Sequence, residues 1–171
     1  LFSQTNIGGI INAYGALDSS YISTCGTDFF IDDVSGFSAG DTVLIIQMKG
    51  VAVNQSNTNI YGDVTLWNDA GKYEKNVVKS VSATSLQFEF QLLHTYEFDG
   101  AVQVVSVPHY VGDVNINALL TAAPWNGTKG GVLAFSASGN VTVNAPVDVT
   151  GDGFLGGVDS KTGVFPDLNN T

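Results

Sequence analysis

The sequence predicts an all-β protein in which a β-barrel or sandwich-like N-terminal domain, residues 1–110, leads into the first coils of a right-handed parallel β-helix, residues 111–171. Three observations predict this fold class. Val, Ile, Thr, Phe and Tyr recur along the chain, as strands prefer, and no long window shows helical periodicity. Residues 112–123 and 139–150 carry one pattern 27 positions apart. From residue 111 onward, short Val-rich strands alternate with glycine-rich corners.

The repeated pattern is the basis for the predicted β-helix. Glycine, valine, asparagine and alanine return in the same slots of both copies, and aliphatic residues return opposite aliphatic residues. A period of this size marks stacked units that cannot bury an apolar face alone. The pattern places Asn117 and Asn144 at one corner, where amide side chains can hydrogen-bond from coil to coil. The alternative is a chance similarity between strands rich in Val and Asn. A solenoid that starts here predicts that further coils follow and that the chain is the front part of a longer protein.

Five segments are predicted as strands of the first domain. Residues 42–49 form a short β-branched run between Gly40 and Gly50, which predicts a central buried strand. In residues 86–90 apolar and polar side chains alternate, which predicts one buried and one wet face. The Asp99-Gly100 pair favours a type I′ turn and predicts a hairpin over residues 96–107. The strands expected are residues 28–32, 42–49, 73–81, 86–91 and 102–107.

Charge restricts the partners that this chain can bind. It contains 13 Asp, 3 Glu, 6 Lys and no Arg, for a net charge of -10. An acidic surface without Arg repels nucleic acid and anionic lipid headgroups. The longest apolar run, residues 43–46, is too short to cross a bilayer. We therefore expect no nucleic-acid partner and no membrane insertion.

Four stretches carry the most distinctive motifs: residues 37–50, 105–110, 119–134 and 147–157. The first contains GDTVLIIQMKG and the third contains APWNGTKGGVLA. Together they resemble the N-terminal region of very large surface adhesins that gliding bacteria export by type IX secretion. The last stretch departs from that pattern at Leu155, where a basic residue is common. The resemblance implies export, a position on the bacterial cell surface, a role in adhesion and gliding motility, and a long repetitive body downstream. It brings no catalytic motif to this chain.

One loop half-matches a calcium-binding pattern. Asp148, Thr150 and Asp152 place oxygen donors at the first, third and fifth slots, Gly153 occupies the sixth, and Asp159 occupies the twelfth. The twelfth slot holds Asp instead of Glu, and Gly156 and Gly157 oppose a following helix. A glycine corner between coils is therefore the favoured interpretation. The alternative is a structural calcium held by Asp148, Asp152 and Asp159, and no other cofactor is expected.

Paired carboxylates raise the question of an enzyme. Asp32 with Asp33, and Glu97 with Asp99, are candidates for the two carboxyl groups of a glycosidase. Adjacent residues on a strand point to opposite faces, and charges beside a turn are usually solvated. His94 and His109 have no nucleophile or metal-ligand spacing around them. The sequence therefore predicts a protein that is not an enzyme.

Aromatic side chains in or near loops are the candidate ligand-binding residues. Trp67, Trp125, Tyr61 and Tyr73 combine apolar area with a polar atom, which suits stacking on sugars. Packing in the core or at a corner is the alternative, above all for Trp125 beside Pro124.

These observations lead to one expected function and two alternatives. We expect a non-catalytic structural and interaction domain that caps a β-helix in a secreted cell-surface adhesin and docks to outer-membrane or surface-anchoring proteins. The first alternative is a carbohydrate- or surface-binding module whose partner is extracellular polysaccharide. The second, least favoured, is a fragment of a β-helix enzyme that acts on polysaccharide.

Overall fold

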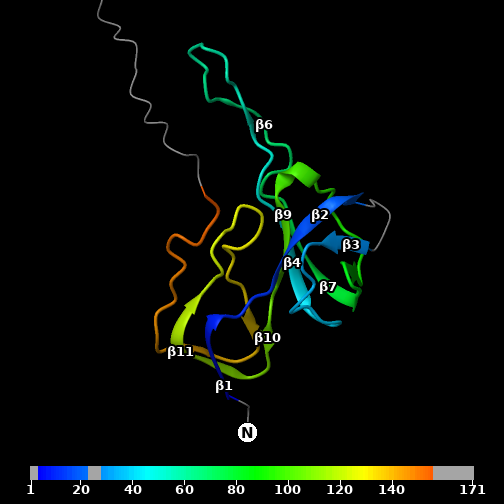
Figure 1. Ribbon diagram of the computed structural model, residues 1–171. Helices are drawn as coiled ribbons and strands as arrows, with labels where there is room; N and C mark the ends of the chain where they lie inside the picture. Colours follow the sequence, from blue (N-terminus) through cyan, green and yellow to red (C-terminus); the bar gives the residue numbers. More distant parts are fainter. Residues whose placement is uncertain (1–3, 23–27, 156–171) are drawn as a thin grey trace, which may run out of the picture.

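The computed structural model describes residues 4–22 and 28–155 and shows an all-β protein (Figure 1). The described residues contain one short 3-10 turn, η1 (Phe98–Gly100), and no helix with the length and hydropathy to span a membrane. In chain order the strands are β1 (Gln4–Ile10), β2 (Tyr14–Ile22), β3 (Asp28–Ile31), β4 (Thr42–Gln47), β5 (Ala52–Val53), β6 (Val64–Leu66), β7 (Tyr73–Val81), β8 (Ser85–Phe88), β9 (Val102–Ser106), β10 (His109–Tyr110), β11 (Asp113–Thr121), β12 (Ser136–Ala137) and β13 (Val141–Val143).

Six of these strands form a closed antiparallel barrel in the order β2-β3-β8-β7-β4-β9. The predicted all-β class and the predicted barrel are therefore confirmed. Every second residue of β4 is buried, as alternation on a half-buried strand requires, and β4 lies between β7 and β9. Phe29 and Phe88 pack inside with ring centroids 5.6 Å apart, and Val43, Ile45 and Val104 are fully buried around them.

Strand β9 is buried along its whole length, so both of its faces are covered. Val102 and Val104 belong to the core of the barrel. Gln103 and Val105 alternate with them and are also fully buried, which places them on the opposite face. That face is covered by the C-terminal part of the chain, because Gln103 hydrogen-bonds to Gly130.

The predicted hairpin at Asp99-Gly100 is wrong. These residues lie in η1, and β9 pairs with β2 and β4 instead of a strand before the turn. Gly100 packs against Gln47 so closely that an added Cβ would lie 2.5 Å from the Gln47 Cδ atom. The glycine therefore serves a close tertiary contact, and local turn propensity does not decide the pairing.

Five of the other strands, β1 and β10 to β13, form a parallel stack made of β1 and of residues 107–155, while β5 and β6 pair with each other antiparallel. Its main sheet has the order β1-β11-β13, and β10 pairs with β12, all in parallel. The predicted division at residue 110 grouped residues 4–10 with the barrel, whereas the pairing of β1 with β11 places them in this stack. The barrel is thus inserted between the first and second strands of the parallel sheet.

The two copies of the sequence repeat lie directly on one another. Val114 pairs with Val141 and Ile116 with Val143, so the 27-residue spacing is also the register of the stack. The predicted contact between the asparagines is confirmed, because Asn144 Nδ2 donates to Asn117 Oδ1 at 2.8 Å. Asn117 Nδ2 in turn donates to Asn6 Oδ1 at 2.9 Å, so the ladder has a third member. The sequence feature that indicates this third member is the dipeptide Asn6-Ile7, which has the same residues as its pairing partner Asn115-Ile116.

Candidate functional site at the junction of barrel and stack

Polar side chains join the barrel to the stack, and most of them contact the junction loop (residues 123–131). Gln103 of β9 is fully buried and makes two hydrogen bonds to the backbone of Gly130. Its Nε2 donates to the Gly130 carbonyl at 3.1 Å, and its Oε1 accepts from the Gly130 N–H at 2.8 Å. Gly130 has a φ of 110°, and an added Cβ would meet the carbonyl oxygen of Pro124. Glycine is therefore required for the loop to reach the barrel.

A short connection between β1 and β2 makes the second set of contacts. Asn12 is buried, and its Nδ2 donates to the carbonyls of Ser106 at 2.7 Å and Ala134 at 2.5 Å. The Tyr14 hydroxyl donates to the Val132 carbonyl at 2.6 Å. Burial raises the pKa of Tyr14 above its ordinary value, so the phenol remains a hydrogen-bond donor even in alkaline solution near that value. These bonds satisfy buried backbone groups on both sides of the junction.

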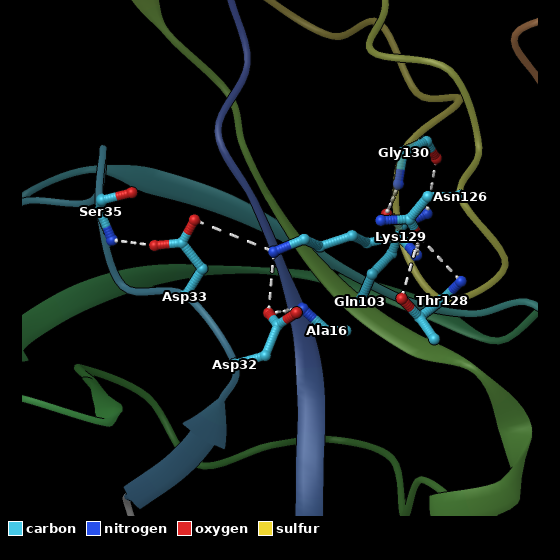
Figure 2. Close-up of polar contacts among 9 residues, drawn as sticks. All are labelled: Ala16, Asp32, Asp33, Ser35, Gln103, Asn126, Thr128, Lys129 and Gly130. Atoms are coloured by element: carbon cyan, nitrogen blue, oxygen red, sulfur yellow. Dashed lines mark hydrogen bonds and ion pairs between the residues drawn. The ribbon is translucent and has the colours of Figure 1, made fainter.

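Lys129 makes the third contact, an ion pair across the junction (Figure 2). Its side chain extends from the junction loop to the turn after β3, where Nζ lies 2.9 Å from Asp32 Oδ1 and 3.9 Å from Asp33 Oδ2. The expectation that Asp32 and Asp33 point to opposite faces is wrong, because β3 ends at Ile31 and strand alternation ends with it. The pKa of Asp33 is lowered, first by hydrogen bonds from Ser35 and then by the charge of Lys129.

Two cavities flank the connection between β1 and β2. One, of about 290 Å³, lies beside the junction loop, and Asp33, Asn126 and Lys129 are part of its wall. The other, of about 510 Å³, lies between the connection and residues 36–42 of the barrel. The junction is therefore a polar joint with open space on both sides of one chain segment.

The aromatic candidates separate into two groups. Tyr61, Trp67 and Tyr73 are 69%, 68% and 64% exposed. They lie on or beside the projecting arm (residues 51–67), which contains β5 and β6 and extends away from the barrel in Figure 1. Trp125 is only 9% exposed and packs edge-on against Phe154, with ring centroids 5.1 Å apart. It therefore fills a corner of the stack and offers little surface to a ligand.

The predicted calcium residues are only partly described. Asp148 Oδ1 accepts a hydrogen bond from the Thr150 N–H at 2.9 Å, and the pKa of Asp148 is lowered first by hydrogen bonding of the Thr150 side chain and then by this backbone bond. Asp152 Oδ2 accepts from the Thr121 hydroxyl at 2.8 Å. Asp159 lies outside the described residues, so the calcium site stays a prediction. Within residues 4–22 and 28–155, no three His, Cys, Asp or Glu side chains are arranged to hold a metal.

The other titratable candidates do not meet at one place. Glu97 and Asp99 are exposed at η1, far along the chain from the Asp32 pair. His94 packs edge-on against Tyr96, and His109 hydrogen-bonds to Ser136 in the stack. The residues that sequence reasoning missed are Asn12, Gln103 and Lys129. Gln103 had a signal, a lone amide within a run of valines, and Lys129 lies in the distinctive APWNGTKGGVLA stretch.

No protein-family model and no curated protein matches the chain. The Gp54 tailspike of Acinetobacter baumannii bacteriophage AP22, solved in complex with A. baumannii capsular saccharide, is 13% identical with a TM-score of 0.39. The alignment covers 85% of this chain and 26% of that one. The tailspike protein gp49 from Pseudomonas phage LKA1 is 18% identical with a TM-score of 0.34, covering 68% of this chain and 20% of that one. The chain thus spans about a quarter or less of each.

Proposed function

We propose that this chain is a non-catalytic structural module in which a β-barrel caps the first coils of a right-handed parallel β-helix. Following the resemblance in its sequence, we place the module at the front of a secreted bacterial surface adhesin that uses type IX secretion. Its partners there are surface-anchoring proteins of the outer membrane. The observation that carries the β-helix in this proposal is the 27-residue register of the stack.

That register is 27 residues where β11 pairs with β13 and where β10 pairs with β12. Beyond the paired strands β11 and β13, it relates His109 to Ser136 and Asp113 to Asn140 through hydrogen bonds. It also relates Leu120 to Val147 through a bridge. A repeat kept through strands and corners alike is what successive coils of a solenoid require.

The two edges of the sheet support a direction for the helix. On the β1 edge the polar Gln4, Thr5 and Asn6 precede the buried Ile7, and the chain enters the barrel after β1 ends at Ile10. On the β13 edge, Val141 and Val143 are exposed, although their partners Val114 and Ile116 are buried. An apolar strand with an open edge favours the addition of another strand. We therefore assign the barrel to the closed end of the helix and further coils to the β13 end.

A repeat insertion tests this proposal. A second copy of residues 112–138, inserted after residue 138, adds one complete period and keeps the 27-residue pairing of β11 with the strand that follows it. We expect a folded monomer with more β-structure by circular dichroism. Its melting temperature should stay within about 4 °C of the parent, because only repeated contacts are added.

The control insertion is a copy of residues 112–133, which ends five residues earlier and breaks the period. This variant should aggregate or melt without a cooperative transition, because its valines no longer stack on valines. Equal behaviour of the two insertions would show that the 27-residue register has no structural role and would overturn the β-helix proposal.

The exposed aromatics favour a second candidate function, binding of an extracellular polysaccharide. Three aromatic side chains that are about two-thirds exposed lie on or beside one arm, where their rings can contact a polymer. With this chain immobilised and a polysaccharide panel applied, Trp67→Ala should lower retention about tenfold or more. Its free energy of unfolding should change by no more than about 0.5 kcal/mol, because the side chain is exposed.

The matched control is Phe90→Ala, which removes an equally exposed aromatic outside the arm. It should leave retention unchanged. Retention of the same polysaccharides by Trp67→Ala and by the parent would exclude the aromatic arm as the binding surface. Retention of outer-membrane proteins with no polysaccharide bound would favour the anchoring role.

A further inference from the structure

The cavity beside the junction loop has the composition of a ligand site. It is formed where three segments meet: the connection from Ile10 to Tyr14, the turn at Asp33 and Ser35, and the junction loop. Its volume of about 290 Å³ is close to the lower end of the range for small-molecule sites, about 300 to 1,000 Å³. It therefore suits a single small ring.

The ion pair in the wall leaves a position for one hydroxyl group. Lys129 Nζ binds Asp32 directly, but the 3.9 Å between Nζ and Asp33 Oδ2 is too long for a hydrogen bond. An oxygen placed about 2.8 Å from both atoms fits between them, because 3.9 Å is less than twice a normal hydrogen-bond length. A ligand hydroxyl there accepts from the ammonium and donates to the carboxylate. Both bonds involve a charged group and are stronger than neutral ones.

Asn126 supplies a further donor in the same wall. Its Oδ1 accepts hydrogen bonds from the backbone N–H groups of Thr128 and Lys129, both at 3.0 Å, so the amide oxygen is used within its own turn. Because the turn occupies Oδ1, the group of Asn126 that can serve a ligand is Nδ2, which can donate to a second hydroxyl. The turn also fixes the backbone from which Lys129 extends.

Part of the lining is apolar, although Asn12, Tyr14 and Ser35 also belong to it. Ile10, Ala13, Ala123 and Pro124 line the cavity together with the polar groups. A pyranose ring has C–H groups that pack on such side chains and hydroxyls that need charged or amide partners. The cavity presents both kinds of surface within one small space.

The charge of the site selects among ring ligands. One ammonium between two carboxylates leaves a local charge of about −1, and the whole chain carries -10. An anionic ligand is therefore repelled, and a ligand ammonium placed between Lys129 Nζ and Asp33 Oδ2 would lie against the Lys129 charge, so a neutral hydroxyl fits that position better. We propose that the junction cavity binds one neutral hexose unit, with Lys129 and Asp33 sharing one of its hydroxyls. This site is separate from the aromatic arm and does not depend on the function proposed above.

The test uses the full 171-residue chain with isotope labelling and follows backbone amides by NMR. D-glucose, D-galactose, D-mannose and N-acetylglucosamine are each titrated, and glucuronate serves as the anionic probe. At least one neutral sugar should give saturable shifts at Asn126, Lys129 and Gly130, with a dissociation constant in the millimolar range. Glucuronate should bind more weakly than glucose. Saturable shifts that appear only at Tyr61 and Trp67 would overturn the proposal, as would no saturable shift with any neutral sugar.

Two substitutions establish the roles of the charged groups. Asp33→Asn keeps the shape of the side chain and should weaken sugar binding about tenfold without lowering the melting temperature, since Asp33 is half exposed. Lys129→Met should weaken binding at least as much. Lys72→Met is the control, because Lys72 forms a similar ion pair with Asp69 away from the cavity, and it should bind sugar normally. Normal binding by Asp33→Asn would overturn the shared-hydroxyl geometry.

Discussion

Replacement of Glu74 by alanine is expected to destabilise the barrel more than any change at the surface. The Glu74 carboxylate is buried and accepts hydrogen bonds from the Leu93 N–H at 2.9 Å, the His94 N–H at 3.2 Å and the Tyr96 hydroxyl at 2.9 Å. Removing it leaves the buried Tyr96 hydroxyl and the partly buried N–H groups of Leu93 and His94 without this acceptor. We expect the free energy of unfolding to fall by about 3 to 5 kcal/mol, measured by urea denaturation.

The fall in the free energy of unfolding is expected to be large because of the position of Glu74 in the fold. No residue between β8 and η1 belongs to a strand, so no ladder of backbone hydrogen bonds holds this segment to the sheet. The Glu74 carboxylate on β7 holds the segment instead. Tyr96 is held in the core by the same bond, and burial first, then Glu74, raises the pKa of its phenol. Glu89→Ala is the control, since it removes an exposed carboxylate nearby and should change stability by no more than about 0.5 kcal/mol. Equal effects of the two changes would show that Glu74 is not structural.

Replacement of Gln103 by alanine is expected to loosen the joint between barrel and stack. The change leaves both backbone groups of Gly130 without partners and creates a cavity at a fully buried position. We expect a loss of about 3 kcal/mol in the free energy of unfolding. Amide hydrogen exchange at Gly130 should become faster, because its N–H loses its acceptor.

Two further variants separate hydrogen bonding from packing at this joint. Gln103→Leu keeps most of the volume but removes both hydrogen bonds, so it should also destabilise and should also expose Gly130 to exchange. Gln91→Ala, at an exposed position, should do neither. If Gln103→Leu were as stable as the parent, packing alone would hold the joint, and the polar account given above would be wrong.

Sequence reasoning located the strands more reliably than their partners. Residues 42–49 and 73–81 were predicted as strands from their composition and boundaries, and β4 and β7 lie there. The Asp99-Gly100 hairpin failed because the contact of Gly100 with Gln47 and the pairing of β9 with β2 and β4 outweigh a local turn preference. Short-range patterns report which backbone shape is favoured, and they do not report which strand lies alongside.

Only some residues of the candidate site could be predicted from the sequence. Asp32 and Asp33 were singled out as a carboxylate pair, but their partner Lys129 is 97 residues from Asp32 in the chain. Trp67 was correctly placed among exposed candidates, whereas Trp125, of the same residue type, is buried. Burial depends on which other segments cover a side chain, so residue type and loop position were not sufficient to distinguish the two tryptophans.

By itself the sequence determined the all-β class, the position of most strands and the 27-residue stacking of Asn117 on Asn144. These features follow residue patterns that recur at short or regular intervals, so they can be recognised in a single sequence. Only the tertiary structure decided that β1 joins the parallel stack, with Asn6 bonded to Asn117 across 111 residues, and that Lys129 reaches the turn after β3. Contacts between residues so far apart in the chain form only when the barrel between them closes. Barrel closure produces no periodic pattern in the sequence.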